Sequence, residues 1–481
     1  MTDLDAVVVG AGPNGLAAAV TLARAGLSVQ VVERGDTIGG GARTAELTLP
    51  GFRHDVCSAV HPMALASEFF RAFELEKRIE LVVPELSYGH PLDAGAAGAA
   101  WLDLERTADS LGRDGAAWRQ LMAPLSRHGD EVAQFTGNSL IRIPQHPVTT
   151  VRFGLRVLEQ GLPTWNLRFR EEVAPAMLTG VAAHSIRTMP SPSTAGAGLS
   201  LAAYAHGRGW PVPIGGSQSI VDALAADLIA HGGTIVTGAE ITDMGQLPSA
   251  RATIFTTSAR ALGEVASDRL PARYLRSLER FSYGNAVAKV DFALNAPVPW
   301  TNADMRQAGT LHVGGTRAEI ARGEQQIADG KHPTSPYVLV SQPGIVDSSR
   351  APQGKHVLWA YTHVPRNSNV DMTEAVTAQI ERFAPGFRDT ILASSNKTAV
   401  DMENYNPNYV GGDIASGAAS IAQLIARPVA SSDPWRTPAR GIYLGSSSAA
   451  PGPGVHGLAG WRAARSALRN EFDLPSPALG L

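Results

Sequence analysis

Residues 6–15 have the sequence AVVVGAGPNG, in which a short apolar run leads directly into three closely spaced glycines. The apolar run is typical of a buried β-strand, and the residues after it fit a helix that ends at Gly26. A second apolar run, LSVQVV at residues 27–32, predicts another strand, and Glu33 follows it directly. Strand, helix and strand in this order predict a complete βαβ unit.

The glycines of this unit have the GxGxxG spacing of a dinucleotide-binding turn. Gly10 permits the tight turn, Gly12 lets the backbone approach a pyrophosphate, and Gly15 lets the helix pack closely on the strand. The helix N-terminus adds free N–H groups and the positive end of its dipole, which attract phosphate. Glu33 would accept hydrogen bonds from the adenosine ribose. The unit therefore predicts dinucleotide binding.

A second glycine cluster favours FAD over NAD as the dinucleotide. Residues 34–44, RGDTIGGGART, place further glycines just after Glu33, where a larger ligand needs close backbone approach. Arg43 in this cluster can neutralise phosphate charge. A flexible surface loop is the alternative interpretation of the same residues. No second βαβ unit with a GxGxxG turn occurs in the sequence, so we expect no built-in NAD(P)H site.

Later parts of the sequence are expected to return to the same domain. A Gly215-Gly216 turn precedes a helical pattern and an apolar strand at 234–236, and a buried strand is expected at 251–257. Near the C-terminus, a strand at 441–445 enters a glycine-rich loop over 446–460. This loop suits a cradle of backbone N–H groups for the flavin end of the ligand, although a plain turn-rich connector is also consistent.

Composition and charge exclude several classes of protein. The 41 basic and 44 acidic residues give a net charge of −3, so no excess positive charge exists to hold a nucleic acid backbone. Cys57 is the only cysteine, which excludes an internal disulfide and a multi-thiolate metal site, and we expect no metal cofactor. The motifs HExxH and GxSxG are absent, which weighs against zinc and serine hydrolases.

An acidic N-terminus and the single cysteine favour a cytoplasmic protein over a secreted one. The sequence offers no uninterrupted run of about 18 apolar residues that would span a bilayer. Association with a membrane surface stays open, because a lipophilic substrate could require it. No strongly basic amphipathic helix in the sequence argues for such association.

The segments between these motifs predict a second unit. Helical patterns dominate from about residue 102 to 188, which suggests a cap. Strands are expected at 286–292, 310–313, 337–340 and 356–361, and they would form a sheet that backs a substrate cavity.

Taken together, these motifs resemble the phytoene desaturase-like flavoproteins, within the wider amine oxidase and glutathione reductase-type FAD fold. The resemblance spans nearly the whole chain and rests on residues 10–33, 39–44, 215–216, 239–241 and 451–457. Two interior stretches, at 347–356 and 406–413, are most similar to the phytoene dehydrogenase-related oxidoreductases, whose substrates are mostly unassigned.

The resemblance implies an α/β protein with a Rossmann-type FAD-binding domain assembled from discontinuous segments. An α+β substrate domain, with a mixed sheet and a helical cap, would be inserted between them. We expect the FAD-binding domain to comprise residues 1–90, 211–262 and 395–481, and the substrate domain residues 91–210 and 263–394.

The resemblance also implies which residues hold non-covalent FAD, with Ile241 beside the adenine and the C-terminal loop over the flavin. The expected cofactor-binding residues are Gly10, Gly12, Pro13, Asn14, Gly15, Glu33, Arg34, Gly40, Gly41, Ala42, Arg43, Thr44, Ile241, Gly445, Ser446, Gly454 and Val455.

Two residues are candidates for catalysis. Lys289 lies in an apolar strand pattern, and in amine oxidase-like relatives the matching lysine holds a water near flavin N5; a solvent-facing lysine is the alternative. His456 lies in the loop that should face the flavin, with a structural histidine as the alternative. His61, His184, Trp210 and Tyr405 are candidates for the substrate pocket, although each also fits a structural role.

The sequence thus predicts an FAD-dependent dehydrogenase, desaturase or oxidase that takes hydride from a hydrophobic molecule, as the resemblance implies an isoprenoid or a carotenoid-like one. Electrons would pass to oxygen, a quinone or another soluble acceptor. The alternatives are a flavin amine oxidase and a low-turnover flavoprotein with a binding or assembly role. No motif indicates the oligomeric state.

Overall fold

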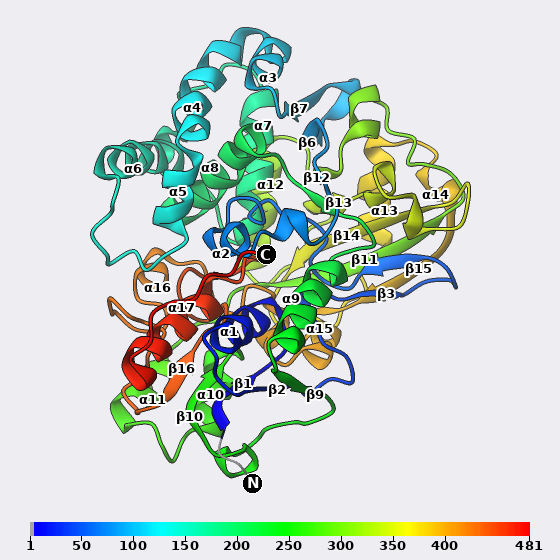
Figure 1. Cartoon of the computed structure of the whole chain (residues 1–481). Coiled ribbons are helices and arrows are strands. Elements are labelled where there is room, and N and C mark those ends of the chain that lie inside the picture. Colours follow the sequence, from blue (N-terminus) through cyan, green and yellow to red (C-terminus); the bar gives the residue numbers. More distant parts are fainter. Residues whose placement is uncertain (1–3) are drawn as a thin grey trace.

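The computed structural model describes residues 4–481 and contains two large β-sheets with helices packed against them (Figure 1). Residues 1–3, at the start of the predicted segment 1–90, lie outside the described residues. The first sheet is parallel throughout, with the strand order β16-β10-β1-β2-β9. Its strands are β1 (Leu4–Val9), β2 (Val29–Val32), β9 (Thr234–Val236), β10 (Ala250–Phe255) and β16 (Ile442–Leu444).

Strands from three distant parts of the chain therefore share this sheet. The helices around it are α1 (Pro13–Arg24), α2 (Glu68–Ala72), α9 (Gln218–Ala230), α10 (Ala259–Val265), α11 (Ala272–Glu279) and α17 (Leu458–Ala467). Helix α1 packs against both α9 and α17, and its small apolar residues join the buried core of the sheet. The predicted Rossmann-type βαβ unit is confirmed, because β1, α1 and β2 follow one another and both strands pair in parallel.

The second sheet is mixed and has the order β15-β11-β14-β13-β12-β6-β7, in which only β12 and β6 pair in parallel. Its strands are β6 (Leu86–Pro91), β7 (Ala97–Trp101), β11 (Ala286–Leu294), β12 (Thr310–Val313), β13 (Val338–Ser341), β14 (His356–Val364) and β15 (Ile391–Lys397). One face packs on α13 (Thr373–Phe383) through a hydrophobic core. The opposite face carries aromatic side chains such as Trp359 and Tyr361, and buried polar ones such as Lys289 and His363.

A helical part covers one end of the second sheet (Figure 1). It consists of α3 (Leu104–Ser110), α4 (Gly115–Arg127), α5 (Gly129–Thr136), α6 (Pro147–Gly161), α7 (Val173–Ala182) and α8 (Pro192–Gly207). Helices α7 and α8 contact strands of the sheet, and the helices share a core around Trp118 and Leu121. The predicted mixed sheet with a helical cap is thereby confirmed.

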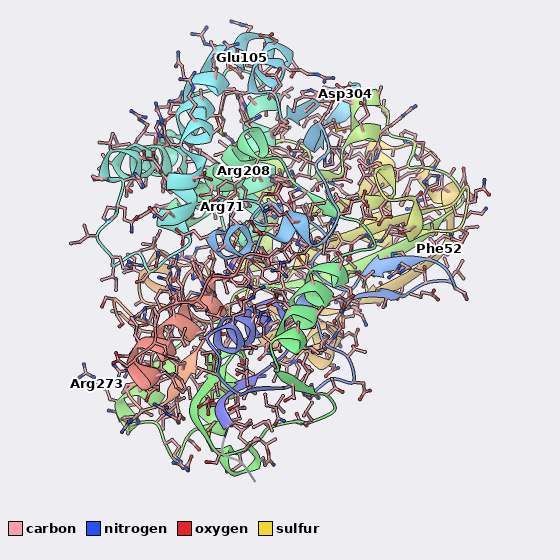
Figure 2. The ribbon with its side chains drawn as sticks, in the orientation of Figure 1. Phe52, Arg71, Glu105, Arg208, Arg273 and Asp304 are labelled. Carbon is pink, nitrogen blue, oxygen red and sulfur yellow. The ribbon has the colours of Figure 1, made fainter. Side chains whose placement is uncertain are left out.

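Shorter elements connect these parts. They are β3 (Thr44–Glu46), β4 (Arg53–Asp55), β5 (Leu81–Val82), β8 (Val212–Pro213), α12 (Arg317–Ala328), α14 (Phe387–Thr390), α15 (Ala399–Tyr405) and α16 (Ile421–Ile425). At the junction of α2 with the cap, Arg71 and Arg208 both contact Asp130, at 3.2 and 2.8 Å (Figure 2).

Two passages of the chain differ from the predicted division into segments. Strand β6 starts at Leu86 and pairs in the second sheet, although the FAD-binding segment was expected to extend to residue 90. Helix α11 packs on the core of the first sheet through Tyr274 and Leu278, although residues 263–394 were expected in the substrate domain. No helix within residues 4–481 is long and apolar enough to cross a membrane.

Candidate functional site

The two glycine clusters face each other at the carboxyl end of β1. A methyl group on Gly40 would lie 3.1 Å from the Cα atom of Gly12, and one on Gly12 would lie 3.7 Å from the Cα atom of Gly40. The N–H group of Gly39 donates a hydrogen bond of 2.9 Å to the carbonyl of Ala11, which fixes the two loops side by side. Together they form a backbone cradle that side chains would fill.

The N-terminus of α1 opens at this cradle without a side-chain cap. Its N-cap is Gly12, the first turn holds no acidic residue, and Pro13 removes one N–H group. The side-chain oxygen of Asn14 is buried and has no hydrogen-bond partner within residues 4–481. Free N–H groups at the positive end of a helix dipole bind anions, so this end of α1 fits a pyrophosphate.

Glu33 lies beside the cradle and accepts hydrogen bonds of 2.8 Å from the N–H groups of Ala11 and Gly35. The N–H group of Ala239 donates to the Glu33 carbonyl, which brings the segment with Ile241 alongside. Arg34 forms an exposed ion pair of 2.9 Å with Glu240 in that segment. The residues predicted for the adenosine half therefore lie together.

Arg43 and Tyr405 close the cradle from the far side. Arg43 donates a hydrogen bond of 3.1 Å to the Tyr405 hydroxyl, which itself donates to the carbonyl of Gly40 at 2.9 Å. Arg43 also donates to the carbonyl of Thr37. Tyr405 thus contacts the second glycine cluster, whereas the sequence suggested it for the substrate pocket.

The C-terminal loop meets the same end of α1. A methyl group on Gly460, in the first turn of α17, would overlap the carbonyl of Asn14, so only glycine permits this approach. Gly445 packs against Gly460 and directly precedes the buried Ser446, and the loop returns through Gly454, which has a φ of 137°. The predicted flavin loop therefore adjoins the predicted phosphate loop.

Thr257, which the sequence analysis missed, also lies at this sheet edge. It follows β10, the neighbour of β1, and its hydroxyl is buried with no partner in the described part of the chain. Its neighbour Thr256 donates to the carbonyl of Val9 at 2.8 Å. The signal was the position of both threonines directly after a strand of the parallel sheet.

His456 is engaged through both ring nitrogens. The N–H group of Leu458 donates to Nδ1 at 3.0 Å, so the proton resides on Nε2, which lies 3.3 Å from the carbonyl of Gly452. Burial lowers the pKa of this imidazole to about 4. No lone pair is free for proton transfer, and the geometry favours the structural alternative.

The sequence left open that Lys289 is a solvent-facing lysine. Lys289 is buried, so this alternative is wrong. Its ammonium group forms an ion pair with Asp291, two residues along the same strand, and the other carboxylate oxygen lies 3.4 Å from His54 Nδ1. Burial lowers the pKa of Lys289, while the Asp291 carboxylate opposes this shift. The pair lies on the face of the second sheet that carries Trp359.

His61 belongs to a buried polar network between the two sheets. Its Nε2 lies 2.7 Å from the Ser217 hydroxyl, and the Ser217 N–H group donates to Asp55 at 2.8 Å. Asp55 accepts a further bond of 2.6 Å from Arg350, and both side chains are fully buried. Arg350 also approaches Asp347 at 3.9 Å.

An imidazole and carboxylate pair lies on the polar face of the second sheet and was not predicted. His363 on β14 donates from Nδ1 to Glu324 on α12 at 2.5 Å, and neither side chain is exposed. His363 Nε2 and the second oxygen of Glu324 have no partner among the described residues. The ring lies 5.7 Å from that of Tyr361 and 5.0 Å from that of Tyr337.

His184 and Trp210, both predicted for the substrate pocket, meet on this same face. Their rings are 5.8 Å apart, and His184 Nε2 shares a hydrogen bond of 2.9 Å with His312 Nε2. Burial lowers the pKa of His184 to about 3, so the ring is neutral. The ring of His312 also stacks on Tyr337 at 6.2 Å, which links this pair to His363.

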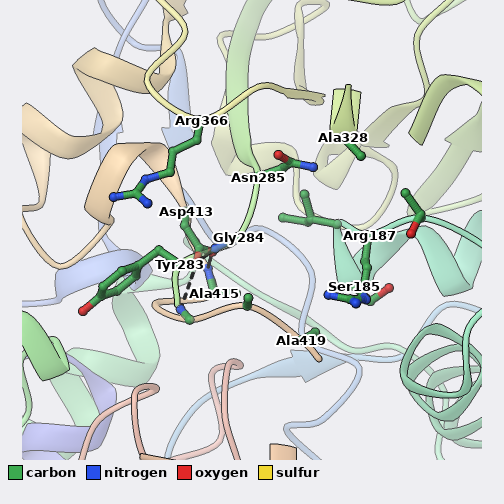
Figure 3. Close-up of a pocket in the computed structure, with 14 residues that line it drawn as sticks. Ser185, Arg187, Tyr283, Gly284, Asn285, Ala328, Arg366, Asp413, Ala415 and Ala419 are labelled. Carbon is green, nitrogen blue, oxygen red and sulfur yellow. Dashed lines mark hydrogen bonds between the residues drawn. The ribbon is translucent and has the colours of Figure 1, made fainter. Parts of the chain in front are cut away.

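A pocket of about 350 Å³ is lined by residues that follow some of these groups in the chain (Figure 3). Ser185 on its wall follows His184, Ala328 lies one helical turn after Glu324, and Arg366 lies three residues after His363. Across the pocket from Ser185 and on the same side as Arg366, Gly284 donates a hydrogen bond of 2.7 Å to Asp413 (Figure 3). No group of three or more potential metal ligands is arranged for a metal ion within residues 4–481.

Comparisons with known proteins agree with this architecture. The family described as an NAD(P)-binding Rossmann-like domain matches residues 8–73. Pyridine nucleotide-disulfide oxidoreductase domain-containing protein 2 of Rattus norvegicus is 26% identical over 97% of this chain and 94% of its own length. Phytoene dehydrogenase of Streptomyces griseus is 27% identical over 80% of this chain and 77% of its own.

Among solved structures, cyclohexylamine oxidase from Brevibacterium oxydans has a TM-score of 0.60 at 15% identity, covering 97% of this chain and 98% of that one. At this identity the likeness concerns the fold. Together the comparisons confirm the family resemblance, the Rossmann-type fold and the oxidoreductase class that the sequence predicted, with a dinucleotide cofactor.

Proposed function

We propose that this chain, which is a phytoene desaturase-like oxidoreductase, binds FAD non-covalently and removes hydride from a hydrophobic substrate. The observation that carries the proposal is the backbone cradle between Gly12 and Gly40, into which the uncapped N-terminus of α1 opens. The diphosphate would lie in this cradle, with the adenosine beside Glu33 and Ile241. Bound FAD supplies a hydride acceptor at flavin N5.

The proposed site residues divide between the two halves of the ligand. Arg43, Thr44 and the glycines around them would hold the adenosine and diphosphate half. Gly445, Ser446, Gly454 and Val455 would hold the flavin half. Lys289, held by Asp291, would place a positive charge on the face of the second sheet that carries Trp359.

The apolar residues between the cradle and the second sheet support a hydrophobic substrate. They form one buried cluster with contributions from the second sheet, the cap and the loop after β4, including Ala59, Ile186, Leu339, Trp359 and Tyr361. Such a lining excludes water and holds a carbon skeleton by contact area. Oxygen, a quinone or another soluble acceptor would then reoxidise the cofactor.

His363 is the group we assign to proton transfer. Its Nδ1 is fixed by Glu324, so Nε2 keeps a free lone pair on the face that carries Tyr361. This is the arrangement of an oriented general base. When hydride leaves a substrate carbon, Nε2 would accept the proton that a neighbouring O–H, N–H or C–H group loses.

Amine oxidation is the alternative function, because the fold is similar to that of a solved amine oxidase. Tyr443, the one tyrosine next to the C-terminal loop, donates to Glu471 within the core of the first domain and does not reach the pocket. An amine oxidase would be expected to frame the flavin with a pair of tyrosines, so this position favours the hydrophobic substrate over the amine. A low-turnover binding or assembly role is the third candidate.

The test is an absorbance spectrum of the purified protein before and after heat denaturation, then during anaerobic incubation with a cell lipid extract or an amine panel. We expect a two-band flavin spectrum, release of the chromophore on heating, and bleaching by the lipid extract. Bleaching by amines alone would establish the alternative function. A flavin that no extract reduces would favour the binding role, and a chain that takes up no FAD would refute the proposal.

A His363→Gln variant is expected to keep its FAD and to be bleached about 100-fold more slowly by the extract that reduces the wild type, because a missing general base costs a factor of this order. Glutamine is close to histidine in size but has no lone pair on nitrogen to take a proton. The measurement is the anaerobic bleaching rate at equal flavin content. The matched control, His356→Gln, changes the far end of the same strand and should leave the rate unchanged. Equal rates in all three proteins would remove His363 from the mechanism.

A further inference from the structure

A row of polar contacts, which we call the Lys289 path, links the buried Lys289 to a partly exposed residue. Lys289 and Asp291 lie two residues apart on β11 and form an ion pair. The second carboxylate oxygen of Asp291 lies 3.4 Å from Nδ1 of His54 on β4. Nε2 of His54 lies 2.9 Å from the hydroxyl of Thr48. Lys289 and His54 are 1% exposed and Asp291 2%, whereas Thr48 is partly exposed. The row therefore leads from the interior towards solvent.

The contact between His54 and Asp291 brings two acceptor atoms together. Neither His54 Nδ1 nor the facing oxygen of Asp291 has a hydrogen-bond partner within residues 4–481. When Nε2 of His54 donates to the Thr48 hydroxyl, Nδ1 carries a lone pair, as the carboxylate oxygen does. Buried polar atoms in proteins are nearly always paired. A single proton on Asp291 would let its O–H group donate to Nδ1, which would pair both atoms at once.

Burial brings the proton affinities of these groups closer to one another. In water a lysine holds its proton far more tightly than a carboxyl group does. Burial lowers the pKa of Lys289 and raises that of Asp291 to about 6, so transfer of a proton from the ammonium to the carboxylate becomes easier. Burial also lowers the pKa of His54 to about 3, which keeps the imidazole neutral. A neutral imidazole takes up a proton on one nitrogen as it releases one from the other.

The charged and titratable groups around the Lys289 path are Asp55, Arg350, Lys397 and Cys57. Asp55 is paired with Arg350 at 2.6 Å, and the positive charge of Arg350 opposes protonation of His54. Lys397 on β15 pairs in register with Lys289, and a neighbouring positive charge favours loss of a proton. Burial raises the pKa of the Cys57 thiol, so this group stays protonated. Asp291 is therefore the carboxylate that takes a proton from Lys289.

We propose that Asp291, His54 and Thr48 carry protons between Lys289 and solvent. An N–H bond of Lys289 breaks as an O–H bond forms on Asp291, and a half turn of the carboxyl group presents this proton to His54 Nδ1. His54 accepts it as its Nε2 proton passes to the Thr48 hydroxyl, which releases its own proton to water. Inward transfer reverses each step, and no electrons move. For its use in catalysis the proposal rests on the proposed function, in which an acceptor such as oxygen or a quinone takes up protons when it reoxidises the cofactor.

The experiment measures how fast the protons on the side-chain nitrogen of Lys289 exchange with water, by NMR of the full chain with isotope-labelled lysine. The sequence holds only five lysines, so few signals appear, and a Lys289→Met variant identifies the signal of interest. In a His54→Gln variant we expect exchange to be about 100-fold slower, because proton transfer through a positioned side chain contributes a factor of this order. Glutamine has no lone pair on nitrogen, so it does not take up a proton at one atom and release it at another.

At the outer end of the path, Thr48→Val should also slow the exchange, and Thr48→Ser should restore it, because serine keeps the hydroxyl. The matched control is His90→Gln. His90 is likewise a buried histidine whose Nδ1 has no partner within residues 4–481, and its Nε2 lies 2.7 Å from the carbonyl of Gly315. This control should exchange like the wild type. An unchanged rate in His54→Gln, or equal slowing in His90→Gln, would overturn the proposal. The flavin spectrum of each sample reports separately on the proposed function.

Discussion

A Gly12→Ala variant is expected to fold like the wild type and to bind FAD at least about 1,000-fold more weakly, a loss of ~4 kcal/mol. Gly12 has a φ of −78° and a ψ of 176°, which alanine adopts without strain. The added methyl group would lie 3.7 Å from the Cα atom of Gly40, an ordinary contact distance. The protein itself therefore tolerates the methyl group, but the group occupies the space through which a pyrophosphate approaches the backbone.

The measurement is the flavin content of the purified variant and its affinity in reconstitution with added FAD, beside its thermal midpoint. Gly154→Ala is the matched control, because a methyl group on Gly154, within α6, meets no atom within 4 Å. It should change neither quantity by much. Full flavin content in Gly12→Ala would show that the cradle does not hold the diphosphate.

Gly15→Ala provides a contrast within the same turn. A methyl group on Gly15 would overlap the carbonyl of Gly10 and crowd the hydroxyl of Thr256. This variant should lose stability as well as FAD, because α1 could no longer pack on β1. The two substitutions together distinguish Gly12, which leaves space for the ligand, from Gly15, which lets the helix pack on the strand.

The first domain could be predicted from the sequence because its determinants are local. The turn at Gly10 to Gly15 and the glycines after Glu33 each span no more than a dozen residues. Their pattern can therefore be recognised without knowledge of the rest of the fold. The family resemblance then supplied the order of the distant segments. The structure confirms that these segments share one parallel sheet.

The contact between His363 and Glu324 could not be predicted, because it joins residues that are far apart in the sequence. The two residues lie on different elements, 39 positions apart, and neither stands in a recognisable motif. His456 shows the converse case, since its place in a glycine-rich loop suggested catalysis while backbone contacts occupy both of its nitrogens. Which nitrogen of a histidine stays free depends on contacts that spacing does not reveal.

We expect a steep loss of stability as the pH falls from about 6.5 towards 4, the result of buried neutral histidines. Burial lowers the pKa of His61, His90, His206 and His456 to about 4, and that of His54 and His184 to about 3. In the unfolded chain each would have a pKa near 6.5. Below that value the unfolded state therefore binds protons that the folded state excludes, and stability falls with pH.

The size of the effect follows from the number of histidines. Each excluded proton costs up to about 1.4 kcal/mol per pH unit, so six together far exceed the margin of a typical domain. Asp291 and Asp413 act in the opposite direction, because burial raises their pKa values, that of Asp291 to about 6. The stabilising effect of these two carboxyl groups at low pH is smaller than the destabilising effect of the six histidines.

The measurement is the thermal midpoint of the full chain from pH 7.5 to 4.5, with an expected drop of at least about 10 °C below pH 6.5. His61→Gln should make the dependence on pH shallower by about one proton. Ser217→Ala is its matched control, because it removes the hydroxyl that contacts His61 Nε2 but leaves the imidazole buried. That control should lower the midpoint at every pH and keep the slope. A midpoint that stays level down to pH 5 would mean that these imidazoles take up protons without unfolding of the chain.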